Sequence, residues 1–316
     1  MTSAIKNSEP ARFGRFREAE QAVWKRYQLE PTEKLLRFGS GRVVRMHEFG
    51  VGDPMLFVHG SGGSGVYWAP LVAKLASEYR CVLIDRPGWT LSTPIEYSAA
   101  DFGRIAADLL SKVFDAIDLE TAHVVGGSIG NLYALRFAQL NPDRVSSVLL
   151  LGGGPLIPAI RPPKFVRLLR SPLGRVIVRI PQKPGMVRKQ VGGLGHEQSL
   201  QEGLIPDELI DLYVATSRYT SGMRHERELV KGIAGRAEFL PGLTIGENEI
   251  SSLSVPTTMV YGSDDPVGNA ALWRSFTRTL PNGAFHEVAG TGHLPWFDKP
   301  REVAELAADH VRRARA

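Results

Sequence analysis

The sequence predicts an α/β fold with a mostly parallel sheet that one helical insert interrupts. Through most of the chain, short apolar runs alternate with longer amphipathic segments, a pattern typical of parallel β-α-β units. The runs are continuously apolar, which indicates strands covered by helices on both faces. The alternation stops at about Pro155 and returns at about residue 251, so the sheet is expected to be completed only after an insert.

The predicted elements follow a regular order. A helix is expected at about residues 15–29, where the residues repeating at steps of three and four are Phe16, Ala19, Val23 and Tyr27. Strand-like runs occupy residues 33–38, 42–49, 54–60, 80–88, 122–127, 146–154 and 256–266 and the first part of 283–293. Further helices are expected at 66–79, 98–117, 128–145, 268–280 and 300–315. Residues 155–250 contain helical segments, prolines and glycines without a convincing buried strand.

Composition fits a large globular core and gives no sign of a membrane span. The 316 residues are 43% hydrophobic and 22% charged, with a formal net charge of +5. The N-terminus lacks the apolar stretch of a signal peptide, and glycines and prolines break the longest uncharged stretch, 145–160. Cys81 is the only cysteine, so it is expected to be a buried small hydrophobic residue. These features predict a cytoplasmic protein without stable membrane insertion.

Ser128 is the first candidate for chemistry. It stands in Gly126-Gly127-Ser128-Ile129-Gly130, between a predicted buried strand and a predicted helix. A G-x-S-x-G turn in this setting exposes a serine at a helix N-terminus, where the helix dipole favours developing negative charge. The alternative is a helix-capping serine after two glycines.

A serine needs a base, and the base needs an orienting carboxylate. Of the eight histidines, His293 is the best candidate, because it lies in a loop that follows the last strand-like run. Asp264 and Asp265 both follow the strand-like run before it. Either aspartate can orient the histidine while the other caps a turn ahead of Pro266.

The glycine-rich stretch HGSGGSG, residues 59–65, offers exposed backbone N–H groups after a strand. Such groups can form an oxyanion hole or bind a phosphate. The stretch lacks the GK[ST] ending of a P-loop and the G-x-G-x-x-G spacing of a dinucleotide site. No cofactor and no metal ion is therefore expected.

Together these motifs resemble the α/β-hydrolase superfamily, in its serine-nucleophile branch with a helical cap. The stretches that carry the resemblance, in the family's order, are FVHGSGGSGVYW, LIDRPGWTLS, VVGGSIGNLYALRFA, MVYGSDDPVG and GTGHLPWFDKP. The resemblance covers almost the whole chain outside the insert. It implies an eight-stranded, mostly parallel α/β-hydrolase sheet flanked by helices. The core would comprise residues 1–154 and 251–316, with a helical cap at 155–250 inserted after strand six.

The resemblance also implies roles for individual residues. The implied nucleophile, base and acid are Ser128, His293 and Asp265. Asp265 is preferred to Asp264 because the family's aspartate usually stands three residues after the glycine that ends its strand, here Gly262. The implied oxyanion-hole donors are the backbone N–H groups of Ile129 and Ser61, with Gly62 a less favoured alternative to Ser61.

Three functions fit these residues. The preferred one is a serine hydrolase that cleaves a carboxylic ester or lactone through an acyl-enzyme. The alternatives are hydrolysis of C–C or amide bonds by the same residues, and a small-molecule receptor without catalysis. The chain departs from the family pattern at Trp89, where a small residue is frequent, and in its glycine-rich loop after HG. These departures affect the expected shape of the substrate pocket rather than the chemistry.

The insert is strongly basic at its start. No Asp or Glu occurs from Arg144 to His196, while nine Lys and Arg residues occur from Arg161 to Lys189. The simplest interpretation is a solvated face of the cap. The functional alternative is attraction of an amphiphilic or anionic substrate. No aromatic interleaving or nucleic-acid motif accompanies the charge, so a nucleic-acid partner is not expected.

Overall fold

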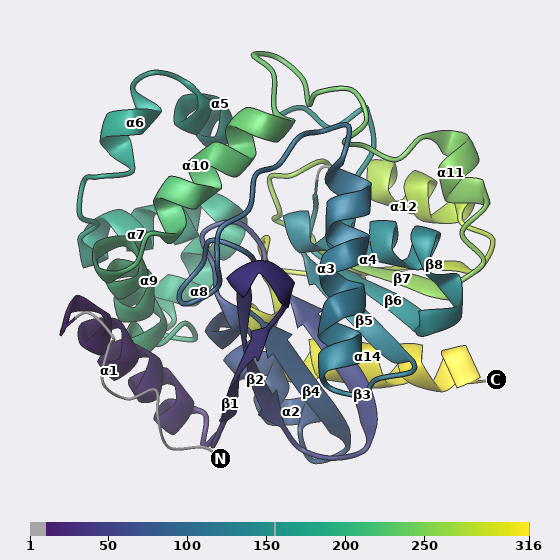
Figure 1. Ribbon diagram of the computed structural model, residues 1–316, viewed down its shortest axis with the longest axis horizontal. Helices are drawn as coiled ribbons and strands as arrows, with labels where there is room; N and C mark the ends of the chain where they lie inside the picture. Colours follow the sequence, from purple (N-terminus) through teal and green to yellow (C-terminus); the bar gives the residue numbers. More distant parts are fainter. Residues whose placement is uncertain (1–10, 155, 316) are drawn as a thin grey trace.

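An eight-stranded sheet runs through the molecule (Figure 1). The computed structural model describes residues 11–154 and 156–315 of the chain. Within this part, the strand order is β1-β2-β4-β3-β5-β6-β7-β8. Strand β2 is antiparallel to both of its neighbours, and the other neighbouring pairs are parallel. The predicted class, a mostly parallel α/β sheet of eight strands, is confirmed.

The strands lie where the apolar runs predict them. They are β1 (Thr32–Arg37), β2 (Val43–Phe49), β3 (Asp53–Val58), β4 (Tyr79–Ile84), β5 (Ala122–Gly127), β6 (Val145–Leu151), β7 (Thr257–Gly262) and β8 (Gly283–Val288). Each begins within one residue of its predicted start. The predicted runs at 80–88 and 256–266 extend past the strand ends, because these segments continue as the loops that follow β4 and β7.

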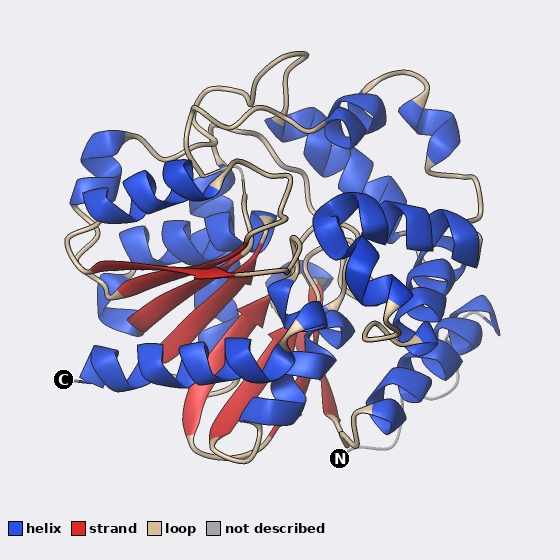
Figure 2. Cartoon of the chain, turned by 180° about the vertical axis from the view of Figure 1, so that it is seen from behind, coloured by secondary structure: helices blue, strands red, loops and turns tan. Residues whose placement is uncertain are grey.

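Helices cover both faces of the sheet, which explains why the strands are apolar on both sides. Successive side chains of a strand point to opposite faces, so Val124 and Val125 of β5 belong to two different hydrophobic clusters. One cluster includes α3 (Phe102–Ala116), α4 (Ile129–Leu140) and α12 (Ala270–Thr279). The other includes α2 (Ala69–Leu75), α13 (Pro295–Asp298) and α14 (Pro300–Arg315). Figure 2 shows α14 lying across the second face.

Between β6 and β7 the described residues form helices and one isolated β-bridge, Ala234–Phe239. We call residues 155–250 the insert. Its helices are α5 (Lys164–Arg170), α6 (Gly174–Ile177), α7 (Pro184–Val191), α8 (Glu197–Gln201), α9 (Asp207–Tyr219), α10 (Gly222–Ile233) and the start of α11 (Glu247–Ser251). Between α7 and α8, the segment η4 (Gly192–His196) is kinked at Gly195. Short 3-10 helices elsewhere are η1 (Gly39–Gly41), η2 (Gly65–Trp68) and η3 (Pro142–Arg144). Figure 1 shows α5 to α10 grouped beside the sheet.

The N-terminal helix contacts the insert as well as the core. Helix α1 (Ala11–Arg26) packs against α9. It ends three residues before the predicted limit, because Gln28 adopts a φ of 55° and the chain turns there. Phe16 and Val23 are buried as the helical pattern predicts.

Two further predictions concern single features of the chain. Cys81 is buried in β4, and burial raises the pKa of its thiol to about 12, as expected for an unreactive core residue. None of the helices in residues 11–154 and 156–315 has the length and apolar character needed to cross a membrane.

Candidate active site

Ser128 occupies a strained turn between β5 and α4. Its φ of 56° and ψ of −119° are rare outside glycine, and such a conformation costs about 1–3 kcal/mol. The flanking glycines permit the turn. A Cβ at Gly126 would lie 2.5 Å from the nitrogen of Asn131, and one at Gly130 would lie 2.0 Å from the oxygen of Val58. The turn holds a partly exposed serine at the N-terminus of α4, as the motif predicts.

Three consecutive glycines after β6, residues 152–154, each face a different predicted site residue. A Cβ on the first glycine would lie 2.2 Å from the carbonyl oxygen of His293. The N–H of the second donates to Asp265 Oδ2 over 2.7 Å. A Cβ on the third would lie 2.5 Å from the carbonyl oxygen of Ser128. This turn therefore brings the loops of all three residues together, and any side chain on it would push them apart.

His293 and Asp265 form a buried hydrogen-bonded pair. Nδ1 of His293 lies 2.9 Å from Oδ1 of Asp265, and the two residues are 6% and 5% exposed. The same Oδ1 accepts a hydrogen bond from the N–H of Val267. Asp264 is exposed, and its side chain accepts a hydrogen bond from the hydroxyl of Ser263. The geometry thus favours Asp265 over Asp264 as the partner of the histidine.

The remaining contact expected of a triad, between Ser128 and His293, is not formed as a hydrogen bond in this structure. Nδ1 of His293 faces Asp265, which leaves Nε2 as the nitrogen able to reach a serine. Nε2 has no hydrogen-bond partner among residues 11–154 and 156–315. Such contacts are often long in unliganded enzymes and tighten when substrate binds.

The candidate oxyanion donors lie on either side of Ser128. Ile129 is the first residue of α4, so its N–H has no intrahelical acceptor. Ser61 and Gly62 follow β3 in a turn, and the N–H of neither donates to another residue in the described part of the chain. The turn is close to the serine, since a Cβ at Gly60 would lie 3.0 Å from Cβ of Ser128. The choice of Ser61 or Gly62 as the second donor stays a prediction.

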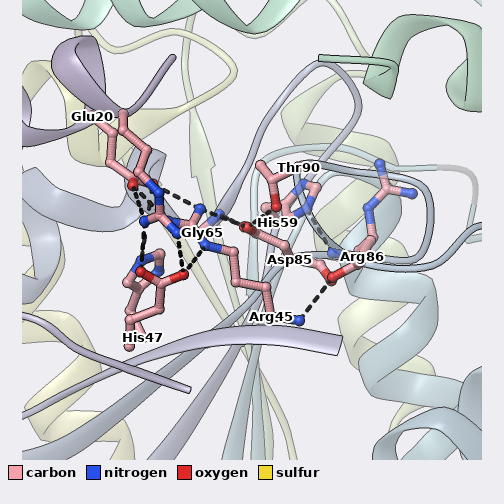
Figure 3. Close-up of polar contacts among 11 residues, drawn as sticks. Glu20, Arg45, His47, His59, Gly65, Asp85, Arg86 and Thr90 are labelled. Carbon is pink, nitrogen blue, oxygen red and sulfur yellow. Dashed lines mark hydrogen bonds and ion pairs between the residues drawn. The ribbon is translucent and has the colours of Figure 1, made fainter. Parts of the chain in front are cut away.

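A buried ionic network holds the far end of this glycine-rich loop (Figure 3). Asp85, directly after β4, accepts hydrogen bonds from the N–H of Gly65 over 2.6 Å and from the hydroxyl of Thr90. Arg45 lies 3.2 Å from the same carboxylate and also pairs with Glu20 of α1. Both charges are fully shielded from solvent, so removing Arg45 would leave the buried carboxylate of Asp85 without its cation, whereas Arg45 would still pair with Glu20 if Asp85 were removed.

His59 holds the near end of the loop. Its Nε2 accepts a hydrogen bond from the N–H of Arg86 over 2.9 Å, and its Nδ1 lies 2.8 Å from the carbonyl oxygen of Gly60 (Figure 3). Burial, and then the charge of Arg86, holds the pKa of His59 well below its usual range. Because both of its ring nitrogens are engaged in hydrogen bonds, His59 is a structural residue rather than a second base.

The insert contacts these same loops through a buried ion pair. Arg86 donates to Glu226 of α10 over 2.9 Å, and both side chains are about 1% exposed. The same guanidinium donates to the carbonyl oxygen of Gly60. Trp89, the large residue that departs from the family pattern, donates its indole N–H to Glu226 and is fully buried. Trp89 thus connects the core to the insert.

Sequence reasoning missed three features of this site. The run of three glycines after β6 was visible, but its contacts reach residues 112 and 141 positions further along the chain and 26 positions earlier. The buried ion pair of Arg86 with Glu226 joins residues 140 apart. A second pair, His196 with Asp298, joins residues 102 apart beside His293. Polar residues of this kind give no periodic signal when their partners are distant in sequence.

Comparison with known proteins assigns the class. Residues 55–306 match the model of the alpha/beta hydrolase family. The chain belongs to the α/β-hydrolase family, and several of its sequence relatives are named as hydrolases.

The individual relatives share less than 30% sequence identity with this chain. The chain is 29% identical to 2-hydroxy-6-oxononadienedioate/2-hydroxy-6-oxononatrienedioate hydrolase 1 of Dechloromonas aromatica over 89% of this chain and 95% of that one. It is 25% identical to the hydrolase of the same name from Cupriavidus pinatubonensis over 85% and 90% of the two chains. Naproxen esterase from Bacillus subtilis has a similar fold, with a TM-score of 0.76, 17% identity and coverage of 96% and 99%.

Proposed function

We propose that this protein is a serine hydrolase that cleaves a carboxylic ester or lactone through an acyl-enzyme. The observation that carries the proposal is the meeting of the strained Ser128 turn with the buried His293–Asp265 pair at one glycine turn. Strain of this kind persists only where the surrounding structure holds it, and it is concentrated at functional sites.

The proposed mechanism gives each residue one task. Ser128 Oγ attacks the carbonyl carbon while His293 Nε2 removes its proton. Asp265 holds the proton of His293 on Nδ1 and stabilises the imidazolium that forms. The N–H groups of Ile129 and Ser61 face the oxyanion of the tetrahedral intermediate. His293 then protonates the leaving alcohol, and water, activated by the same histidine, hydrolyses the acyl-enzyme.

A second candidate is hydrolysis of a C–C bond in an anionic keto acid. It is favoured by the sequence relatives, whose names describe hydrolases of a dicarboxylate. The cations buried in the core weigh against it for this chain. Arg86, the buried cation that contacts Gly60, is already neutralised by Glu226. The buried Arg45 and Arg136 are also paired with carboxylates, so neither has a free charge to offer a substrate carboxylate.

The two candidates can be separated with the wild-type chain. We expect turnover of short p-nitrophenyl esters or simple lactones, with kcat/KM at least about tenfold above that for a 2-hydroxy-6-oxo-dienoate. A burst of p-nitrophenol equivalent to one site per chain would support the acyl-enzyme. A reversed preference would replace the ester proposal with the C–C candidate. No turnover of either class would indicate the receptor alternative.

A further inference from the structure

Three consecutive backbone N–H groups hold the loop that carries His293 through hydrogen bonds to other segments. The N–H of Gly292 donates to Asp298 Oδ2 over 2.9 Å, and the N–H of His293 donates to the oxygen of Leu194 over 2.8 Å. The N–H of Leu294 donates to Nε2 of His196 over 3.1 Å. Two of the three acceptors, Leu194 and His196, belong to the kinked segment η4 of the insert. The insert therefore forms hydrogen bonds with the main chain of the candidate base and of the residue after it.

His196 and Asp298 close this arrangement into a ring of hydrogen bonds. Nδ1 of His196 lies 2.9 and 2.8 Å from the two carboxylate oxygens of Asp298, and the side chains are 0% and 2% exposed. Because the N–H of Leu294 donates to Nε2, that nitrogen carries no proton. The proton of a neutral His196 is then on Nδ1 and points to Asp298. The pair thus links the two residues that flank His293 in sequence.

The backbones of the two segments are in direct contact. Gly195 has a φ of 89°, and a Cβ there would lie 2.2 Å from the oxygen of Asp264 and 3.0 Å from Cα of Gly292. A Cβ at Gly292 would lie 2.6 Å from the oxygen of Leu194. The chain is kinked at Gly195, whose positive φ is not helical. Here the kink brings main-chain atoms, rather than flexible side chains, against the loops of His293 and Asp265.

We propose that residues 194–196 of the insert, together with Asp298, form a positioning element for His293. The proposal rests on the proposed function, in which His293 is the base. Proton transfer depends on the placement of the base, and a displacement of about 1 Å can lower the rate by about 10²-fold. His196 and Asp298 do not touch the reacting atoms. They fix the backbone from which the imidazole reaches Ser128, so the insert contributes to kcat and not only to substrate access.

The first test separates positioning from folding. His196→Ala should lower kcat by about 10- to 100-fold and change KM by less than about threefold, with activity expressed per titrated active site. His310→Ala is the matched control. His310 is also a buried histidine, bonded to Thr258 at the start of β7, and its loss should lower stability while kcat stays within about twofold.

Two conservative variants divide the contacts of His196. A glutamine places its amide oxygen near Nε2 and can accept from Leu294, whereas an asparagine places its amide nitrogen near Nδ1 and can donate to Asp298. Because the Leu294 contact adjoins His293, His196→Gln should recover more of kcat than His196→Asn. These variants and Asp298→Asn keep the test decisive if His196→Ala does not fold.

Hydrogen exchange gives a readout that does not require activity. The amides of residues 292–294 should exchange at least about tenfold faster in His196→Ala than in the wild type, and at the wild-type rate in His310→Ala. Unchanged exchange together with wild-type kcat would overturn the proposal, as would faster exchange without any loss of kcat. A wild-type chain that hydrolyses nothing, but shows the exchange effect, would overturn the proposed function and leave the positioning of the loop intact.

Discussion

Opposite edges of the sheet hold two groups of the same three residue types. The groups are Ser128, His293 and Asp265 at the carboxyl ends of the strands, and Ser147, His123 and Asp53 toward their amino ends. In the second group, Ser147 and His123 are register partners on β6 and β5, with Oγ and Nδ1 2.7 Å apart. Nε2 of His123 lies 3.9 Å from Oδ2 of Asp53. Residue types and distances alone would make either group a candidate for catalysis.

The two groups differ in backbone and surroundings. Ser147 is fully buried within a strand, and the pKa of His123 is lowered mainly by burial, against the opposing charge of Asp53. Ser128 is partly exposed in a turn with positive φ, directly before a helix. A nucleophile needs access and nearby donors for an oxyanion, which the setting of Ser128 offers and that of Ser147 does not. The difference indicates that position on the sheet decides the role, as expected for open α/β folds.

The largest expected effect separates the two serines. Ser128→Ala should lower kcat by about 10³- to 10⁶-fold without loss of fold, because nucleophilic attack is removed. Ser147→Ala should leave kcat within about twofold and lower the free energy of unfolding by about 1–3 kcal/mol, since a buried hydrogen bond to His123 is lost. Steady-state kinetics and urea unfolding of both variants check this. Near-normal turnover by Ser128→Ala would contradict the assignment of Ser128 as the nucleophile.

The next effect separates the two neighbouring aspartates. Asp265→Asn should lower kcat by about 10²- to 10⁴-fold, because the histidine loses the group that fixes its tautomer. Asp264→Asn should stay within about threefold, since its exposed side chain accepts a hydrogen bond only from Ser263 among the described residues. The kinetics of the two variants, measured at equal folded fraction, give the answer. A larger loss of kcat for Asp264→Asn would make Asp264, rather than Asp265, the carboxylate that orients His293.

A smaller effect concerns the positive charge of the insert. A cavity of about 450 Å³ in the insert is lined by Arg175, Arg179, Arg224, Arg227 and Lys231, together with Glu228, which pairs with Arg227 and Lys231. Replacing Arg175 and Arg179 by glutamate should lower kcat/KM about three- to tenfold for an anionic ester at 0.01 M salt and spare a neutral ester. The effect should shrink at 0.1 M salt, where the Debye length falls from about 30 Å to about 10 Å. Arg170, another cation of the basic stretch, is less suitable for this substitution, because its guanidinium donates a hydrogen bond to the carbonyl oxygen of Ala234.

Equal losses for the charged and the neutral ester would mean that these substitutions disturb the packing of the insert. No loss for either would leave the basic stretch as a solvated face.

The smallest effect concerns acid stability. Burial lowers the pKa of His310 to about 3, against about 6.5 in the unfolded chain. Between these values the unfolded chain binds a proton that the folded chain does not, so stability falls as pH falls below about 6.5. His310→Gln should reduce this slope by about 1.4 kcal/mol per pH unit and leave kcat at pH 7 within about twofold. Urea unfolding at pH 7, 6 and 5 measures the slope, and an unchanged slope would contradict the assignment.

The strands and the glycine turn at Ser128 could be predicted because their signals are local. Apolar runs of six or seven residues fix the strands, and the sterics of Gly126 and Gly130 act within the motif itself. The choice between Asp264 and Asp265 could be made only by analogy, because adjacent residues share one sequence context. Which of them faces His293 depends on how the loops after β7 and β8 meet.

The hydrogen bonds between the insert and the loop of His293 could not be predicted from the sequence. His196 follows a run of glycines that gives no clear helical pattern, and its partners Asp298 and Leu294 are about 100 residues away. Buried polar pairs of this kind are specified by tertiary packing rather than by periodicity. The same holds for Glu226, which the helical pattern of α10 does not distinguish from a solvated glutamate.

The most direct test of the central claim is covalent labelling with a fluorophosphonate, followed by peptide mapping. The reagent reacts with a serine only where a base and an oxyanion site are assembled around it. We expect one label per chain, on Ser128, in the wild type and in Ser147→Ala, and none in Ser128→Ala. A label on Ser147, or equal labelling of Ser128→Ala and the wild type, would contradict the assignment of the active site to the carboxyl edge.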